Sequence, residues 1–224
     1  MAIKNTSTDG QGSSYDYLVR PFISMFCEAF DRIQSPSKER LTAKAAQSLI
    51  DALIAKLLQI GLKTFIYELN RLKTEGLLVG KDPNEKFTYF VHIYNDSEKL
   101  LKLYETYPVL ARKLSVATSR HIDFISKLFS DLDESWGELH DSLLKGSRES
   151  SIVDIKLGQG DTHEKGKSVV TIEFDKGRLV YKPRNLEVER IFDDVIEFFS
   201  ANPSFLKCVL LNQSILRTSP YLNI

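Results

Sequence analysis

The sequence has few residues that would bind a metal or cross-link the chain. Its 224 residues include two cysteines, Cys27 and Cys208, which lie far apart and match no C-x-x-C spacing. Neither a disulfide framework nor a zinc site is predicted, and a reducing, cytoplasmic location is expected. His92, His121 and His140 have no ligand spacing to one another, so we interpret each as a surface or packing residue.

An excess of one charge is also missing, because 30 basic residues balance 30 acidic residues. No long block of like charge would follow a phosphate backbone or an anionic membrane, so nucleic acid is not an expected partner. Polar residues interrupt every hydrophobic run before it reaches roughly 18 residues, which predicts no membrane span. Residues 1–14 lack the apolar core of a secretory signal and are interpreted as a disordered tail.

Helical periodicity dominates residues 15–145. Apolar residues recur at helical spacing after Ser35-Pro36-Ser37 and predict one long amphipathic helix, which ends at Gly76, a residue suited to the left-handed cap. Pro108 is well placed in a first turn and predicts the start of a second long helix that continues to Leu139. Two long helices indicate a mostly helical bundle.

Residues 146–224 follow a different pattern. Ser168–Phe174 and Arg178–Lys182 are short runs rich in Val, Ile, Phe and Tyr, and residues 175–177 join them as an Asp-Lys-Gly turn. This arrangement predicts an antiparallel β-hairpin. The predicted fold class is therefore α+β, with a domain boundary in the polar segment 145–151.

A helix is predicted after the hairpin, beginning at the capping residue Asn185. One face is apolar and the other carries acids, one of which is a candidate partner for Lys182. A final run, residues 206–216, is interpreted as one or two strands. The apolar positions of the helix are Val188, Ile191, Phe192, Val195 and Phe199, and its acids include Asp193, Asp194 and Glu197.

The second half orders its parts like the N-terminal lobe of a protein kinase. A glycine-containing loop, residues 158–166, precedes the hairpin, Lys182 ends the second strand, and an acidic helix follows. In a kinase the loop covers the nucleotide phosphates, the lysine contacts them, and a helix carboxylate holds the lysine. The loop departs from G-x-G-x-x-G, so the pattern alone also fits a surface hairpin that ends in lysine.

A closer resemblance favours the kinase-like interpretation. Three segments resemble a signature block of class II lanthipeptide synthetase dehydratases: Gly160-Asp161-Thr162-His163, Lys165-Gly166-Lys167-Ser168-Val169-Val170 and Val180-Tyr181-Lys182-Pro183-Arg184. The first of these is usually Gly-Asp-Ser-His in that family, so Thr162 keeps the hydroxyl. Upstream segments of the same enzymes are similar to Arg20-Pro21-Phe22, to residues 62–70 and to Tyr107-Pro108-Val109-Leu110-Ala111-Arg112.

The resemblance implies a dehydration domain with a helical region, residues 15–145, and a partial kinase-like N-lobe, residues 146–224. Members of the family use ATP and Mg²⁺ to phosphorylate Ser and Thr of a precursor peptide, and then eliminate phosphate to leave dehydroamino acids. The implied catalytic residues are Asp161, His163 and Lys182, and the implied nucleotide contacts are Gly160, Gly166, Lys182 and Arg184. For Arg184 a structural or solvated role is an equal alternative.

The family's catalytic loop and metal-binding acids have no counterpart in this sequence. We therefore expect a fragment, a truncated gene or a split subunit that is inactive alone, whose partners are the precursor peptide and the missing carboxyl-terminal part. The alternative is a non-catalytic helical module that binds a peptide or another protein.

Overall fold

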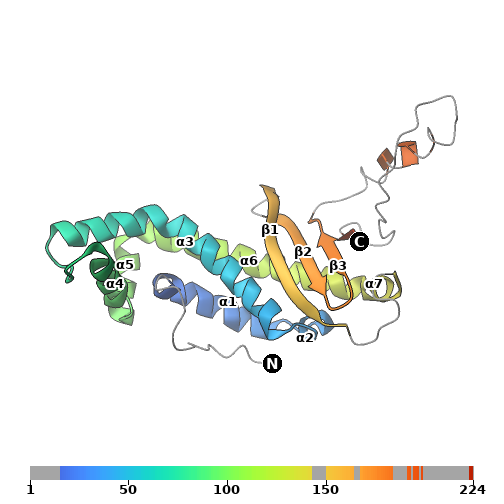
Figure 1. Ribbon diagram of the computed structural model, residues 1–224, viewed down its shortest axis with the longest axis horizontal. Coiled ribbons are helices and arrows are strands. Elements are labelled where there is room, and N and C mark those ends of the chain that lie inside the picture. Colours follow the sequence, from blue (N-terminus) through green and yellow to red (C-terminus); the bar gives the residue numbers. More distant parts are fainter. Residues whose placement is uncertain are drawn as a thin grey trace. The chain divides into compact units, whose positions relative to one another are not determined.

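The described structure is helical in its first part and ends in an antiparallel sheet (Figure 1), which confirms the expected α+β class. The computed structural model describes residues 16–142, 150–163, 167–183, 191–192, 194–196, 198 and 222–223. Side chains are described at these positions except 140, 142, 159–163, 167 and 222–223. Within this part of the chain, no helix combines the length and apolarity needed to cross a bilayer.

Eight helical elements precede the sheet in the described residues. They are η1 (Asp16–Val19, a 3-10 helix), α1 (Arg20–Arg32), α2 (Pro36–Glu39), α3 (Ala43–Thr74), α4 (Pro83–Ile93), α5 (Ser97–Thr106), α6 (Pro108–Glu134) and α7 (Trp136–Ser142). The strands are β1 (Ile152–His163), β2 (Lys167–Phe174), β3 (Arg178–Tyr181) and the short β4 (Leu222–Asn223), and they lie side by side in that order.

The first long helix begins later than the sequence predicted. The segment Ser35-Pro36-Ser37 starts only the single turn α2, which is capped where the Ser35 hydroxyl accepts a hydrogen bond from the Lys38 amide at 3.2 Å. The backbone then pairs with β1, because Thr42 N–H donates to Ile152 O and Ile152 N–H donates to Arg40 O, both at 2.9 Å. Helix α3 starts only after this contact with β1.

The predicted end of that helix is confirmed at Gly76. Its φ of 69° lies in the left-handed region, where glycine carries no steric penalty. Leu77 N–H donates to Leu72 O at 2.9 Å, and Gly76 N–H donates to Lys73 O at 3.2 Å. These two bonds form a Schellman motif, which satisfies carbonyls that the end of a helix otherwise leaves unpaired.

The second long helix, α6, starts at Pro108 as predicted but ends at Glu134, and α7 follows after Ser135. Two shorter helices, α4 and α5, lie between α3 and α6. Each has an aspartate cap: Asp82 accepts from the amide of the third helical residue of α4, and Asp96 accepts from two amides of α5. Aspartate at an N-cap is a strong helix start signal.

Two compact units make up the chain, and neither is one continuous stretch. Unit 1 comprises residues 1–33 and 50–125, and unit 2 comprises residues 34–49 and 126–224. Helices α3 and α6 each supply residues to both units. The domain boundary expected in the segment 145–151, part of which lies outside the described residues, stays a prediction.

Aromatic contacts hold α1 in unit 1. The buried ring of Phe22 meets Tyr104 of α5 edge to face, with centroids 5.3 Å apart. Phe26 meets His121 of α6 at 5.0 Å. His121 is 5% exposed, so the packing role inferred from the sequence is confirmed for this histidine, while His92 is exposed. Edge-to-face pairs of this kind stabilise a core beyond the area they bury.

One carboxylate is buried in unit 1 and has three donor side chains. Glu68 on α3 is 3% exposed and accepts hydrogen bonds from the hydroxyls of Tyr94 at 2.6 Å and Tyr107 at 2.7 Å. Arg71, one turn further along α3, donates Nε and Nη2 to the two carboxylate oxygens at 2.9 and 2.7 Å. The other side of the guanidinium pairs with Glu75 at 2.7 Å.

These contacts change how the groups ionise. The hydrogen bond from Arg71 is the largest cause that lowers the pKa of Glu68 to about 2, and the two tyrosine hydroxyls add to it. Burial and the neighbouring carboxylate raise the pKa of Tyr107 to about 12, and the same causes raise the pKa of Tyr94. Glu68 is therefore ionised in the folded protein at neutral pH, and both tyrosines keep the protons that they donate.

Unit 2 is organised around the sheet, and the predicted hairpin is confirmed. Strands β2 and β3 are antiparallel, with Ile172 opposite Leu179 and Val170 opposite Tyr181. These four side chains are almost fully buried, whereas the residues that alternate with them along β2 and β3 are more exposed. One face of the sheet is therefore the core of unit 2. The ring of Trp136, on α7, packs near Phe174 at 6.1 Å between centroids.

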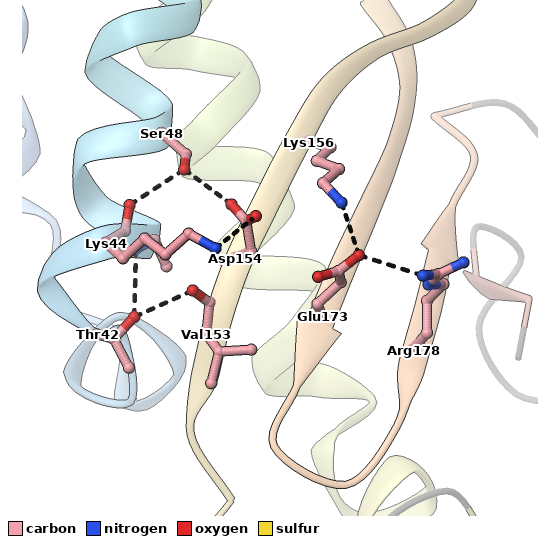
Figure 2. A network of polar contacts seen from close by, with 9 residues as sticks. Thr42, Lys44, Ser48, Val153, Asp154, Lys156, Glu173 and Arg178 are labelled. Atoms are coloured by element: carbon pink, nitrogen blue, oxygen red, sulfur yellow. Dashed lines mark hydrogen bonds and ion pairs between the residues drawn. The ribbon is translucent and has the colours of Figure 1, made fainter.

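Strand β1 is attached to the first turns of α3 by polar contacts (Figure 2). Asp154 of β1 is 8% exposed, accepts from the Ser48 hydroxyl at 2.8 Å and pairs with Lys44 Nζ at 3.2 Å. Thr42 Oγ1 donates to Val153 O at 3.3 Å. Burial acts to raise the pKa of Asp154, but the hydrogen bonds from Ser48 and Lys44 together outweigh it and hold this pKa below its usual value.

The Glu68 cluster predicts unequal effects of two mutations that both remove an acid from Arg71. Glu68→Gln should lower the free energy of unfolding by about 2 to 3 kcal/mol, because a buried charged acceptor of several hydrogen bonds is lost. Glu75→Gln is the matched control and should cost less than about 1 kcal/mol, since Glu75 lies at the surface. Urea denaturation followed by circular dichroism measures both; equal effects would contradict the prediction.

The low pKa of Glu68 also predicts a dependence on pH. Its folded-state pKa of about 2 lies below the value of an unfolded glutamate, about 4.3, so its stabilising effect is complete above that value. The effect is lost as the pH falls from about 4.3 through about 2. The difference in stability between wild type and Glu68→Gln should therefore shrink between about pH 5 and pH 3, measured by urea titrations. A constant difference would exclude this linkage.

Candidate functional site

The candidate site lies at the end of the sheet where β1 turns into β2. The register pairs Gln159 with Val169 and His163 with Lys167 across these two strands. Because Val170 lies opposite Tyr181, the next residue, Lys182, follows directly at the level of Val169. The last residue of β3 and the end of β1 therefore approach the same end of the sheet.

The glycine-containing segment is partly strand, which corrects the expectation of a loop over residues 158–166. Residues 158–163 belong to β1, and the register shifts between Lys156 and Gln159. Gly158 lies in this shift with a φ of 78°, and its N–H donates to Ser168 Oγ at 2.9 Å. A glycine with positive φ at a register shift is the pattern of a β-bulge, which bends a strand and changes the direction of the residues after it.

The predicted site residues are described to different extents. Gly160, Asp161 and His163 are placed by their backbone in the last four residues of β1. Their side chains, and all of Gly166 and Arg184, lie outside the described residues. The roles assigned to these five residues stay predictions.

Lys182 follows β3 on the side of the sheet that faces away from the core. Leu179 and Tyr181 are buried, whereas Val180 and Lys182 are partly exposed. Because successive residues of a strand point to opposite faces, Lys182 belongs to the same face as Val180. Lys182 therefore continues the outer face of the sheet, directly after a residue that is fixed in the core.

That neighbouring residue makes a polar contact which the sequence analysis did not identify. Tyr181 is 1% exposed, and its hydroxyl donates to Asp131 Oδ2 of α6 at 2.9 Å. Asp131 is 2% exposed, and Lys127 pairs with its other carboxylate oxygen. A tyrosine on the inward face of a strand indicates that a polar partner must be buried with it, but the sequence does not reveal which one.

An ionic cluster lies on the outer face of the sheet, at the end opposite to Lys182 (Figure 2). Glu173 of β2 accepts from Lys156 at 2.8 Å and pairs with Arg178 at 3.3 Å. The hydrogen bond from Lys156 is the largest cause that lowers the pKa of Glu173. Both cations at this end pair with Glu173, so the cluster stabilises the sheet.

The helix predicted after the hairpin is described only in part. Residues 191–192, 194–196 and 198 are helical, while Asn185, Val188, Asp193, Glu197 and Phe199 lie outside the described residues. Asp194 is exposed, and the acid that would hold Lys182 stays unassigned. The described apolar side chains of this helix are not buried: Ile191, Phe192, Val195 and Phe198 are 42 to 66% exposed.

The other surface features of the described residues do not form a second candidate site. No group of three or more His, Cys, Asp or Glu side chains is arranged to hold a metal ion there. A shallow hollow in unit 1 is lined by residues of α4 and the segment before it, including Gly80, Glu85 and His92. Neither lysine nor arginine lines that hollow, so it offers no cation to a phosphate group.

A curated protein shares distant similarity with this chain. It is the lacticin 481/lactococcin biosynthesis protein LcnDR2 of Lactococcus lactis subsp. lactis, which is 24% identical over 140 residues. The match covers 62% of this chain but 15% of LcnDR2, so this chain corresponds to a small part of that protein. The similarity is consistent with the family that the sequence motifs indicated.

A family model also matches the carboxyl-terminal half of the chain. The match spans residues 107–219, which include α6, the sheet strands β1 to β3 and every predicted site residue. Because these residues make up half of the 224, the chain belongs to the family described as Domain of unknown function (DUF4135).

Proposed function

We propose that this chain supplies the nucleotide-binding sheet of a dehydration domain of the class II lanthipeptide synthetase type. In the complete domain, ATP would phosphorylate Ser and Thr side chains of a precursor peptide, and elimination of the phosphate would give dehydroamino acids. The observation that carries the proposal is the approach of Lys182 and the end of β1 to the same end of an antiparallel sheet. The similarity to a lacticin biosynthesis protein supports it.

The arrangement of the described strands supports a site for the phosphate groups of a nucleotide. Lys182 would offer an ammonium group on the outer face of the sheet, and the last four residues of β1, which reach the same end of the sheet, include the motif residues Gly160, Asp161 and His163. This corresponds to the order of a kinase N-lobe, in which the glycine-rich connection covers the phosphates and the third strand carries the lysine. The described residues do not fit a metal site, so no step is assigned to Mg²⁺ on this chain.

The two steps of the proposed reaction, phosphoryl transfer and elimination, would use different residues. In the first step the peptide hydroxyl oxygen forms a bond to the γ-phosphorus, the bond to the bridging oxygen of ADP breaks, and the hydroxyl proton is released to solvent. Lys182 would stabilise the negative charge that develops on the phosphate oxygens, which is the largest kind of contribution to such transfers. His163 would support this transfer. In the second step Asp161 would accept the proton from the Cα atom, while the carbon–oxygen bond to phosphate breaks.

A non-catalytic binding module remains the second candidate, because one observation favours it. Ile191, Phe192, Val195 and Phe198 expose apolar surface on the described helical residues. Exposed apolar groups that lie close together on one helix are typical of a surface that binds another protein. This candidate requires no nucleotide, so an experiment that detects ATP at Lys182 separates the two functions.

The nucleotide proposal predicts selective labelling of Lys182 by an acyl-phosphate derivative of ATP. In that reagent a lysine amine attacks the acyl carbon, the acyl–phosphate bond breaks and the nucleotide leaves, so lysines beside bound phosphates react fastest. Lys182 should be modified faster than Lys176, which is exposed in the β2–β3 turn. Excess ATP should slow the labelling of Lys182 at least about tenfold, a difference of about 1.4 kcal/mol, and leave Lys176 unchanged.

Mass spectrometry of the proteolysed chain measures both sites in one sample. Lys182→Arg is the control for the site of the reaction, because it keeps the positive charge but removes the reactive amine. Labelling of Lys182 at the rate of Lys176, with no effect of ATP, would contradict the proposed function and favour the binding module.

A further inference from the structure

Burying the Tyr181 hydroxyl together with the Asp131 carboxylate is energetically unfavourable in itself, and the packing of the core does not require it. The tyrosine is among the largest fully buried side chains of the described residues, and a phenylalanine ring would fill almost the same volume. The hydroxyl requires an acceptor in the core, and that acceptor is a carboxylate that is itself 2% exposed. Burying an ionised carboxylate is unfavourable unless it is paired and hydrogen-bonded.

Lys127 and Tyr181 satisfy the two oxygens of that carboxylate separately. Lys127 Nζ pairs with Oδ1 from one turn earlier on α6, and the Tyr181 hydroxyl donates to Oδ2. The ion pair lies within one helix, whereas the hydroxyl joins α6 to β3 across 50 positions of sequence. Asp131 therefore links the last residue of β3 to the part of α6 that lies in the same compact unit.

The position of this link matters because β3 is short. It has four residues, and Tyr181 is the last of them. Lys182 comes directly afterwards, so the direction of its side chain depends on the backbone at Tyr181. The buried ring fixes the depth of this residue, and the hydrogen bond fixes its direction, because such a bond weakens steeply when its geometry is distorted.

We propose that Asp131 and Tyr181 are positioning residues for Lys182, which hold the end of β3 so that the ammonium group stays at the nucleotide phosphates. This inference rests on the proposed function and deepens it. Neither residue touches the substrate: Tyr181 acts through the backbone that it shares with Lys182, and Asp131 acts through Tyr181. A displacement of a catalytic group by about 1 Å is enough to lower a rate by up to about a hundredfold.

The test is Tyr181→Phe, which removes the hydroxyl and keeps the ring. The labelling of Lys182 by the acyl-phosphate derivative of ATP should slow about tenfold, and the protection by ATP should weaken. Labelling of Lys176 should not change. Tyr94→Phe is the matched control, because it removes a hydroxyl of the same kind from the buried carboxylate of Glu68 in unit 1. It should leave the labelling of Lys182 at the wild-type rate.

Two variants of Asp131 separate an effect on the position of Lys182 from an effect on folding. Asp131→Asn removes the charge but keeps an oxygen that can accept from Tyr181, so it should retain most of the labelling of Lys182, while Asp131→Ala should lose as much as Tyr181→Phe. Circular dichroism shows whether each variant is folded. If Tyr181→Phe does not fold, the comparison of Asp131→Asn with Asp131→Ala decides.

The outcomes distinguish this inference from the proposed function. Wild-type labelling of Lys182 that ATP suppresses, together with unchanged labelling in folded Tyr181→Phe, would overturn the positioning role and leave the proposed function intact. Wild-type labelling that ATP does not affect would overturn both. Loss of folding in every variant of Tyr181 and Asp131 would also overturn the positioning role, since the two residues would then maintain the fold and not the position of Lys182.

Discussion

A buried carboxylate has to be given hydrogen-bond donors, and this requirement organises both compact units. In unit 1 the donors of Glu68 come from α3, from the end of α4 and from the residue before α6. In unit 2 the donors of Asp131 come from α6 and β3. Each acid thereby joins elements that are distant in the sequence, since a missing donor would leave a charge uncompensated in the core. The apolar packing surrounds these links.

The sequence predicted the elements that depend on local chemistry. Pro108 marked the start of α6 and Gly76 the end of α3, because both residues act through their own backbone. The sequence did not predict that the backbone of residues 40–42 pairs with β1. Their geometry depends on hydrogen bonds to Ile152, and no periodicity within residues 35–45 contains that information. The strand character of residues 158–163 was missed for a related reason, because two glycines suggested a loop, whereas Gly158 lies in a bulge.

The candidate site was likewise predicted only in part from the sequence. The motif segments identified Lys182 and the β1–β2 connection, and the strand register follows from the alternation of Val, Ile and Tyr. Tyr181 lay within the motif, but its partner did not, and Asp131 looks like any other acid on an amphipathic helix. The resemblance segments upstream contain Phe22, Glu68 and Tyr107, which all prove to be packing or polar-core residues of unit 1. These three residues of the upstream segments therefore contribute to the core of unit 1.

The pairing of residues 40–42 with β1 has a consequence for how the protein is made. Thr42 and Val153 contact each other although they lie 111 positions apart. A ribosome releases the amino end first. Every residue of unit 1 has therefore been synthesised before β1, the strand that pairs with residues 40–42. Closing such a long loop is entropically unfavourable and slow. Residues 34–49 therefore lack their partner strand until residue 153 has been synthesised, when every residue of unit 1 is already present.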